Sequence, residues 1–442
     1  MDSKEFGRQL TYEREMDPGK QRAFDLHARD LVRRFSGLGS AVTNGARVDF
    51  RNYIHYVRAV HGLSAAMDRL EELLGSGLGA DLYATSGMLA ARRAGDYRRA
   101  ADFLAKAHAR WPQNTQISVF LVETMIAADR VDGAVEHLGT VDEVSEQIAS
   151  SPVGLKLAEL AAVCGFWPYV DRVLTHRGLY RSAIGDRTLA KRAEIAHHYR
   201  GQDSEVPVYV LNMPEDERKL SLLNHLYGKF DVRPSRHEGV DGRILSPAEL
   251  TEVTAHRGRQ IGKGALGCAL GHFSMWERFI DGSDSHALIL EDDGLPYTWH
   301  NLSALAESAG SFDVLFVNER MSAVPAGLLS TGISSLWETL GTKPDTARGW
   351  GTDGYMISRR GAEKLIEAVT ADKVLSHIDS QLAAYGIAPG LVPQSIAQTV
   401  GLAVRRTSSY APTLDIRCLD FPLVASMDFG DSTIGRLGGH AL

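Results

Sequence analysis

The stretch His286-Ala-Leu-Ile-Leu-Glu-Asp-Asp-Gly294 joins an apolar run to three consecutive carboxylates and a glycine. A short apolar run of this kind is typical of a buried strand in a parallel sheet. Open α/β sheets bind their ligands at the carboxyl ends of such strands, and Glu291, Asp292 and Asp293 would lie at that end. Like charges side by side repel one another unless something positive lies among them. The stretch therefore predicts an α/β sheet with a charged site at its edge.

The second half of the chain alternates between β-rich and helical segments. The β-rich runs are at residues 206–212, 286–290 and 313–317, and the helical patterns are at 216–227, 265–281 and 361–369. Apolar strands that alternate with amphipathic helices indicate an α/β domain with a mostly parallel sheet. We place this domain at residues 206–410. Residues 411–442 follow as a C-terminal tail that either covers the domain or is mobile.

The first 200 residues have the pattern of a helical domain. Between about residues 65 and 174, apolar residues recur at intervals of three and four. Small and apolar residues also recur with a period of 34, namely Ala66, Ala100 and Ala134, and Leu70, Leu104 and Leu138. Such a period, with a small residue at a helix crossing, resembles the tetratricopeptide repeat, which we expect within residues 1–200. The alternative is a set of ordinary helical hairpins.

The composition excludes several classes of protein. The net charge of −7 argues against nucleic acid as the main partner, because phosphate binding needs a basic face. The 3 cysteines are far apart and predict neither a disulfide framework nor a zinc site. The chain has no run of about 18 apolar residues and no secretory signal, so we expect a cytoplasmic protein without a membrane span. Peripheral association with the inner membrane is compatible with this composition.

Two glycine-containing segments need an interpretation of their own. Gly262-Lys-Gly-Ala-Leu-Gly267 matches the dinucleotide-binding pattern GxGxxG by letter, but no convincing strand precedes it. We interpret it as the start of a helix. Asp241-Gly242 is expected to form a turn in which Gly242 has a positive φ.

The three carboxylates after the apolar run are candidates for a metal site. Side chains alternate along an extended chain, so Glu291 and Asp293 would point to one side and Asp292 to the other. Mg²⁺ or Mn²⁺ binds oxygen ligands and keeps open positions for phosphate oxygens, so these acids would hold a metal that in turn holds a phosphate. The alternative is a solvated acidic turn after a strand.

Six segments in a fixed order carry a family resemblance. They are VPVYVLNMPEDERK from Val206, GVDGR from Gly239, GALGCALGHFSMW from Gly264, ALILEDD from Ala287, GTDGYMISRRGAEKL from Gly351 and HIDSQL from His377. Together they resemble glycosyltransferase family 25, over about residues 206–410. This family comprises bacterial lipopolysaccharide and lipooligosaccharide galactosyltransferases and the collagen galactosyltransferases. The resemblance implies a GT-A fold and a metal-dependent, inverting transfer of a hexose from a UDP-sugar, most commonly UDP-galactose, with Mn²⁺ as the usual metal.

The resemblance also implies roles for residues of this chain. It implies donor contacts by Asn212, Arg218, Asp241, His272 and Asp292. It implies metal ligands among Glu291, Asp293 and His377. Asp379 would be the base that takes the proton of the acceptor hydroxyl, with Asp353 as the next candidate. Gln398 and Ser408 stand roughly where the family ends with a Gln and a Ser.

Two of these residues have a structural alternative. His272 would otherwise be a core histidine that is hydrogen-bonded at the sheet. Asp379 would otherwise be an acid at a helix N-terminus, stabilised by the helix dipole. Arg218 is expected to substitute for an arginine that the family usually has directly after the first strand, because Asn212-Met-Pro-Glu stands there in this chain.

Three functions are compatible with these patterns. The first is a glycosyltransferase with a nucleotide-sugar donor and a glycan or protein acceptor that the helical repeats hold. The second is a degenerate transferase domain that acts, together with the helical repeats, as a non-catalytic interaction or scaffold protein. The third is a metal-dependent phosphoesterase, which would need more His and Asp ligands than these motifs offer.

Overall fold

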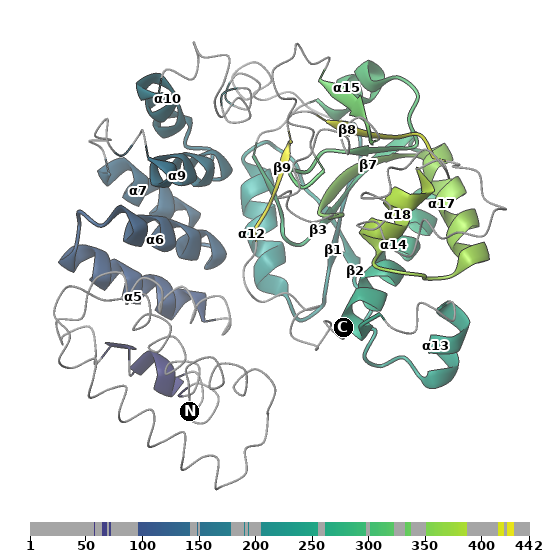
Figure 1. Ribbon diagram of the computed structural model, residues 1–442, viewed down its shortest axis with the longest axis horizontal. Coiled ribbons are helices and arrows are strands. Elements are labelled where there is room, and N and C mark those ends of the chain that lie inside the picture. The colour runs from purple at the N-terminus through teal and green to yellow at the C-terminus, as the bar shows by residue number, and fades with distance from the viewer. Residues whose placement is uncertain are drawn as a thin grey trace, which may run out of the picture. The chain divides into compact units, whose positions relative to one another are not determined.

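The computed structural model describes two compact units, one ending at Leu160 and the other running from Ala161 to Asp428. Figure 1 shows the helices and strands of both. The described residues are 96–141, 151–177, 205–254, 261–297, 301–321, 332–336, 351–386, 414–419 and 422–427, with a few single residues before and between them. No helix in these ranges is both long enough and apolar enough to cross a bilayer.

The described part of the first 200 residues is helical. Its helices are α5 (Tyr97–Arg110), α6 (Thr115–Ala127), α7 (Val131–Thr140), α9 (Pro152–Val163) and α10 (Trp167–His176). The side chain of Asp96 accepts a hydrogen bond from the backbone N–H of Arg99 at the start of α5. Asn114 caps α6 in the same way. These caps satisfy backbone donors that a helix leaves free at its N-terminus.

The 34-residue period marks the core of this helical part. The residues that share it are all 1% exposed or less, namely Ala66, Ala100 and Ala134, and Leu70, Leu104 and Leu138. Alanines at equivalent positions let helices approach closely, and the leucines fill the space beside them. Residues 72–95, which lie within the region expected to hold the repeats, are outside the described residues.

The described part of the second unit contains a seven-stranded sheet in the order β2-β1-β3-β7-β5-β8-β6. The strands are β1 (Val208–Asn212), β2 (Ser235–Glu238), β3 (His286–Glu291), β5 (Val314–Phe316), β6 (Ile333–Ser335), β7 (Gly354–Ser358) and β8 (Ile416–Leu419). A separate pair joins β4 (Gly294–Pro296) to β9 (Val424–Ser426). The strands expected at residues 206–212, 286–290 and 313–317 are present as β1, β3 and β5.

The sheet is mixed, which corrects the prediction of a mostly parallel sheet. Strands β1–β2, β1–β3 and β5–β8 pair in parallel, whereas β3–β7, β5–β7 and β6–β8 pair antiparallel. Every residue of β7 is buried. A strand buried on both faces reads the same whichever way it runs, so its sequence does not indicate its direction. The reversal brings the start of β7 next to the ends of β3 and β5.

Residues beyond 410 are part of the sheet, although the sequence predicts a tail from residue 411. Strand β8 lies between β5 and β6. It is anchored by Asp313, whose side chain is fully buried and whose Oδ2 accepts a hydrogen bond from the backbone N–H of Asp415 at 2.8 Å. Arg360 and Lys364 pair with the same carboxylate at 2.8 and 2.7 Å. Apolar burial alone does not reveal such a long-range strand, because its partners are distant in sequence.

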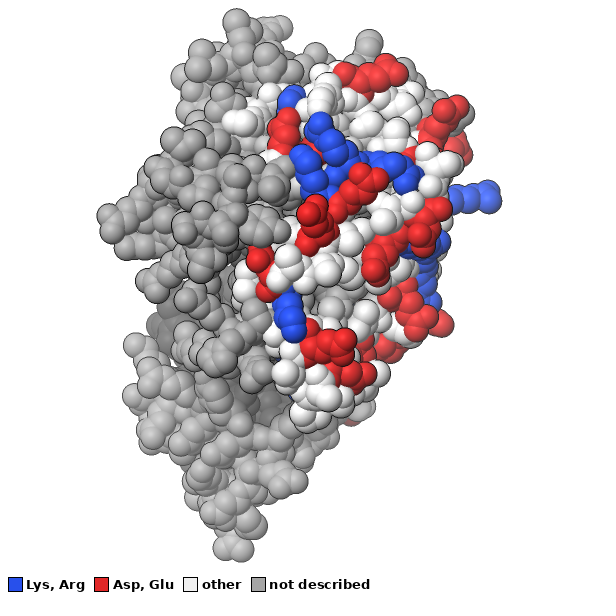
Figure 2. Space-filling model, turned by 90° about the vertical axis from the view of Figure 1, so that its right-hand side faces the viewer, with Lys and Arg blue, Asp and Glu red and all other residues white. Residues whose placement is uncertain are grey.

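Helices cover both faces of the sheet (Figure 1). Helix α12 (Glu217–Gly228) lies on one face, and α14 (Lys263–Asp281), α17 (Arg359–Asp372) and α18 (Ile378–Tyr385) lie on the other. Two further helices, α13 (Pro247–Val253) and α15 (Leu302–Ala309), complete the described unit. Alternate residues of the strands, such as Leu211, Ala287 and Ile289, join one apolar core with α14 and α17. On one face of the molecule, Lys and Arg side chains are interleaved with Asp and Glu (Figure 2).

Helix α14 begins at Lys263 with Gly262 as its N-cap residue, so the GxGxxG segment is the start of a helix. Gly242 is not among the glycines with positive φ, which corrects that prediction. A Cβ on Gly242 would lie 2.0 Å from the carbonyl oxygen of Lys263, and one on Gly267 would lie 2.2 Å from that of Val240. Glycine is needed at both positions because the loop before the helix packs directly against its first turns.

Candidate functional site

Strand alternation separates the three consecutive carboxylates at the end of β3. Ala287 and Ile289 belong to the core beneath α14, and Glu291 continues this side of the strand. Its Oε1 lies 3.3 Å from Nε2 of His272, a residue of α14. Asp292 points to the opposite side, where Lys219 of α12 reaches it. The arrangement follows from the two-residue period of an extended chain.

Asp292 is held by a buried network at the end of β1. Lys219 Nζ lies 3.1 Å from its Oδ1, and Asn212 Nδ2 donates to its Oδ2 at 3.1 Å. The same lysine lies 3.4 Å from Asp216 Oδ2. Burial raises the pKa of Asp292 above its ordinary value, although Lys219 and Asn212 favour the charged carboxylate. Asp292 therefore fixes α12 to the strand ends.

Glu291 is held from two directions. The hydroxyl of Thr352 donates a hydrogen bond to Oε1 of Glu291, and Nε2 of His272 contacts the same oxygen. Burial alone would raise the pKa of Glu291, but the hydrogen bonds from His272 and Thr352 and the charge of Arg320 outweigh it, so the pKa is lowered. Glu291 is therefore a charged carboxylate whose orientation is set by His272 and Thr352.

His272 is fully buried in a hydrogen-bonded chain of aromatic side chains. Trp276 Nε1 donates to the hydroxyl oxygen of Tyr355 at 2.8 Å, and this hydroxyl lies 2.9 Å from Nδ1 of His272. Since the Tyr355 oxygen already accepts one hydrogen bond, its own proton is available to Nδ1. We assign the remaining imidazole proton to Nε2, which donates it to Glu291. His272 thus positions Glu291, which agrees with its alternative reading as a hydrogen-bonded core histidine.

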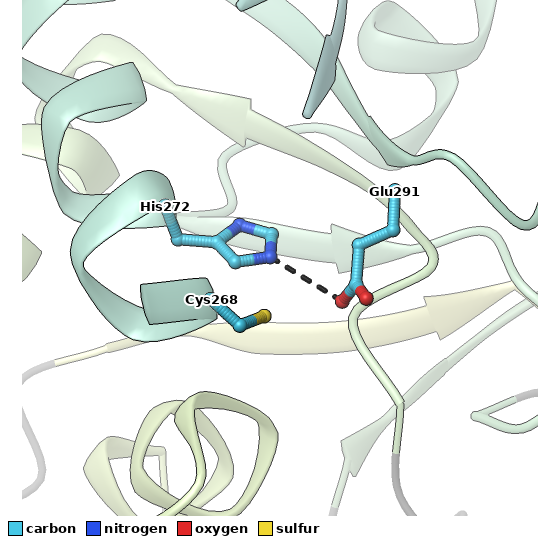
Figure 3. Close-up of side chains that lie close together, drawn as sticks. All are labelled: Cys268, His272 and Glu291. Carbon is cyan, nitrogen blue, oxygen red and sulfur yellow. Dashed lines mark hydrogen bonds and ion pairs between the residues drawn. The ribbon is translucent and has the colours of Figure 1, made fainter. Parts of the chain in front are cut away.

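Cys268, His272 and Glu291 lie together at one end of the site (Figure 3). A ligand atom of each lies within 4.8 Å of the others, and in the described part of the chain this is the group of three that could hold a metal ion. Burial and the nearby Glu291 and Asp379 carboxylates raise the pKa of the Cys268 thiol well above its ordinary value, so it keeps its proton. Both imidazole nitrogens already have partners. This group does not suit a hard cation such as Mn²⁺.

Asp293 and Asp353 form a second group around one arginine. Arg320, which follows β5, places Nη2 3.3 Å from Asp293 Oδ2 and Nε 3.3 Å from Asp353 Oδ1. Asn318 Nδ2 also donates to Asp353 Oδ1 at 2.8 Å. Ser426 accepts hydrogen bonds from the same guanidinium and ties it to β9. Residues from the ends of β3 and β5 and the start of β7 therefore meet at one edge of the sheet.

Burial dominates the charge state of these two acids. It raises the pKa of Asp353 to about 6, against the opposing effect of Arg320 and with further help from Glu291. Burial, followed by the Glu291 and Asp353 charges, raises the pKa of Asp293 well above its ordinary value. Asp293 Oδ1 and Asp353 Oδ2 are buried and have no hydrogen-bond partner among the described residues. A cation within reach of these oxygens would compensate them, since buried carboxylates need a compensating charge.

Asp379 and His377 lie at the start of α18. His377 is the N-cap residue, and Asp379 is in the first turn, where its Oδ1 accepts a hydrogen bond from the backbone N–H of Ser380 at 2.6 Å. Burial raises the pKa of Asp379, and the Glu291 charge adds to this, although Ser380 and His377 oppose it. Asp379 is therefore close enough to interact electrostatically with the acidic group. His377 is not in the group of three potential metal ligands described above.

Two of the residues expected to contact the donor lie outside these networks. Asp241 pairs with Arg243, whose Nη2 lies 2.6 Å from its Oδ2, and this pairing lowers the pKa of Asp241. Arg243 also reaches Glu215 at 3.1 Å. Arg218 is half-buried on α12, but its neighbour Lys219 is the cation that contacts Asp292. Gln398 and Ser408 lie outside the described residues.

Four residues of the site are not found by the sequence patterns: Lys219, Asn318, Arg320 and Thr352. Three of them could have been found from their positions beside the ends of predicted or observed strands. Asn318 and Arg320 follow β5 within four residues, and Thr352 precedes β7 by two. Polar residues directly after a buried strand of a parallel sheet lie at its ligand-binding edge. The stretch after residue 317 is therefore expected to carry site residues, like the stretch after residue 290.

The edge of the mixed sheet where β3 and β5 end and β7 begins therefore carries the carboxylates of Glu291, Asp292, Asp293 and Asp353 beside the cations Lys219 and Arg320. Residues 207–296 match the family model of glycosyltransferase family 25 (LPS biosynthesis protein), and residues 91–147 match a tetratricopeptide repeat model. The matched region includes β1, α14 and all three consecutive carboxylates. Both resemblances predicted from the sequence are thereby confirmed.

Similar proteins carry the same family name. A glycosyltransferase 25 family member of Aedes aegypti is 25% identical over 187 residues, which is 38% of this chain and 29% of that protein. Procollagen galactosyltransferase 1 of Danio rerio is 26% identical over 185 residues, with the same coverage. Procollagen galactosyltransferase 2 of Homo sapiens is 22% identical over 185 residues, which is 38% of this chain and 28% of that protein. This chain therefore spans less than a third of the length of these relatives.

Proposed function

We propose that this chain is a glycosyltransferase that moves a hexose from a UDP-sugar to a glycan or protein acceptor, with inversion and with the help of a divalent metal. Galactose is the first sugar to test, because two of the relatives are named as galactosyltransferases. The observation that carries the proposal is the group of carboxylates formed by the half-buried Glu291 and Asp293 and the buried Asp353, at the carboxyl edge of the sheet beside Arg320. The match to family 25 over residues 207–296 supports it.

The fold supports a nucleotide-sugar site of the GT-A kind. Parallel strands β1, β2 and β3 end at the same edge, and the antiparallel strand β7 begins there. The acidic residues follow β3 directly, so a donor bound at this edge would place its diphosphate over the carboxylates. Lys219 and Arg320 supply positive charge beside them.

The residues of this edge fit a hard divalent cation such as Mn²⁺ or Mg²⁺. The donors are carboxylate oxygens, which such ions prefer, and two of them are buried without a hydrogen-bond partner among the described residues. When bound, the cation would neutralise the charge that develops on the departing diphosphate. Glu291 and His377 are further candidate ligands carried over from the family resemblance.

Asp379 is the better of the two candidate bases. In an inverting transfer, the base takes the proton of the acceptor hydroxyl while its oxygen attacks C1 of the sugar and the bond from C1 to the UDP oxygen breaks. Asp379 is half-buried at the start of α18, and its raised pKa helps it to accept a proton. Asp353 is 1% exposed and is fixed by Asn318 and Arg320, so an acceptor hydroxyl cannot approach it as easily.

The test is the hydrolysis of UDP-galactose by the full chain in the presence of Mn²⁺, followed by proton NMR. Water serves as the acceptor, so the natural acceptor need not be known. Because the donor has an α-linked sugar, inversion releases β-galactose first, and Asp379→Asn is expected to lower the rate by about 10²-fold or more. Release of α-galactose would exclude inversion, and a rate unaffected by Asp379→Asn would exclude this residue as the base.

The non-catalytic alternative is tested by the same experiment. Failure to hydrolyse any of the common UDP-hexoses, together with failure to bind UDP, would favour a scaffold in which the helical repeats recruit a partner. The proposal that the repeats hold the acceptor depends on the transferase and would fail with it.

A further inference from the structure

Asp293 and Asp353 come from different strands and share one guanidinium. Asp293 follows β3 and Asp353 precedes β7, and these strands are neighbours in which Leu290 pairs with Gly354. Arg320 contacts both acids at 3.3 Å. The two carboxylates are together only because β7 runs antiparallel to β3, so no sequence motif contains both.

In each of the two acids, one carboxylate oxygen contacts Arg320 and the other has no hydrogen-bond partner among the described residues. Asp353 Oδ1 receives the amide of Asn318 and the guanidinium of Arg320, whereas its Oδ2 is buried with no hydrogen-bond partner in the described part of the chain. Asp293 Oδ2 contacts Arg320, and Asp293 Oδ1 is buried, likewise without a hydrogen-bond partner in the described part of the chain. A bare carboxylate oxygen inside a protein is costly, and a metal ion is a partner that compensates two at once.

The backbone around the pair is closely packed. A Cβ on Gly351 would lie 2.4 Å from Asp353 Oδ1 and 2.5 Å from Arg320 Cδ. A Cβ on Gly294 would lie 2.2 Å from the carbonyl oxygen of Asp353. The backbone therefore packs directly against Asp353 and Arg320, as a preorganised ion site requires.

We propose that Asp293 and Asp353 together bind the divalent cation, and that Arg320 is the internal cation that holds these two carboxylates when no metal is bound. The inference rests on the proposed function, because the cation is the one that the transferase uses. It assigns Asp353 as a metal ligand and not as a base. It also makes Arg320 a competitor of the metal, since both neutralise the same two acids.

The experiment measures Mn²⁺ binding to the full chain from the electron paramagnetic resonance signal of free Mn²⁺, without donor or acceptor. Asp353→Asn and Glu291→Gln form a matched pair, because each replaces a carboxylate near Asp293 with its amide. Asp353→Asn is expected to weaken binding about tenfold more than Glu291→Gln, because Glu291 is already held by His272 and Thr352. Equal losses would overturn the inference, because Asp353 would then contribute no more to Mn²⁺ binding than a carboxylate that His272 and Thr352 already hold.

Replacement of Arg320 by Gln is expected to change the Mn²⁺ affinity in the opposite direction. Loss of the competing cation is expected to tighten Mn²⁺ binding by about threefold or more, while Arg320→Lys keeps the charge and stays near the wild type. A purely structural role for Arg320 would weaken binding in both variants. The exposed Asp281, at the other end of α14, provides Asp281→Asn as the control, and thermal unfolding of each variant verifies the fold.

The outcomes separate the two proposals. If the wild type does not bind Mn²⁺ or Mg²⁺, the metal dependence of the proposed transferase fails and this inference fails with it. If the wild type binds Mn²⁺ but Asp353→Asn behaves like Glu291→Gln, only the assignment of Asp353 fails. Weaker Mn²⁺ binding in Arg320→Gln would overturn the competition between Arg320 and the metal.

Discussion

Replacement of Lys219 by Met tests how strongly the buried network at Asp292 holds α12 to the sheet. The lysine side chain is 5% exposed and that of Asp292 is 16% exposed, with 3.1 Å between Nζ and Oδ1. At an effective dielectric constant of about 20, two unit charges at this distance attract one another by about 5 kcal/mol. Removal of one partner leaves a buried charge without compensation, so Lys219→Met is expected to lower the free energy of unfolding by about 3–5 kcal/mol.

The second substitution separates the ion pair from simple packing. In Lys219→Met/Asp292→Asn the buried charge of Asp292 is removed together with that of Lys219, so that only Asp216 loses a cation, and the Asn side chain keeps an oxygen for the amide of Asn212. We expect the double variant to regain at least half of the lost stability, which gives a coupling energy of about 2 kcal/mol. Arg243→Met is the matched control, because its pairs with Asp241 and Glu215 are at the surface and their loss should leave the free energy of unfolding nearly unchanged.

The assay follows hydrogen exchange by mass spectrometry as a function of urea. Peptides from β1, β3 and α12 report on the α/β unit alone, which matters because a chain with two units need not unfold in one step. A loss below about 1 kcal/mol in Lys219→Met, or a double variant whose loss is the sum of the two single losses, would refute the reasoning.

Three further predictions concern other parts of the chain. Burial, with help from His108, lowers the pKa of His137 to about 4, so stability is lost as the pH falls from about 6.5 to 4, by about 2 kcal/mol after allowance for partial exposure. Hydrogen exchange of peptides from α7, followed against urea at several pH values, should show this loss of stability with falling pH, and His137→Phe should abolish it. Gly267→Ala should destabilise the α/β unit by about 2 kcal/mol or more because its Cβ meets a backbone oxygen, whereas Gly228→Ala, with open space, should be neutral or stabilising in thermal unfolding. Tyr355→Phe should cost about 1–3 kcal/mol by leaving two buried ring nitrogens without their partner, and an unchanged melting temperature would contradict this network.

The periodicity of apolar residues was sufficient to predict the strands and helices whose burial pattern is contained within a few neighbouring residues. Strands β1 and β3 and helices α12 and α14 appear close to their predicted bounds, since each has a buried side with a clear period. Alternation also places Glu291 and Asp292 on opposite sides of β3, as the structure shows. These features depend on neighbours within a few residues.

Other features depend on partners distant in sequence. The direction of β7 and the insertion of β8 beside β5 are set by pairing across the sheet, which burial patterns do not encode. Helix phase explains why Lys219 and not Arg218 reaches the acidic residues, because neighbouring residues on a helix point about 100° apart. Arg320 lies after a strand that the sequence does predict, but nothing local shows which acids it would meet.

The resemblance to family 25 supplied what physical reasoning from one sequence could not. Three carboxylates after a strand are compatible with a metal site or with a solvated turn, and only the order of six segments favoured the first. The structure adds that one oxygen each of Asp293 and Asp353 is buried without a hydrogen-bond partner among the described residues. Asp379 and His377 are placed near the acids by α18, and their roles remain predictions.

The most direct test of the account is calorimetry of UDP binding to the full chain, with and without Mn²⁺, on the wild type and on Asp293→Ala. The account predicts binding that requires Mn²⁺ and is lost in the variant, because the diphosphate would be held through a cation bound at Asp293. UDP binding that is equally strong without metal, or that survives in Asp293→Ala, would contradict a metal-held diphosphate at this edge of the sheet.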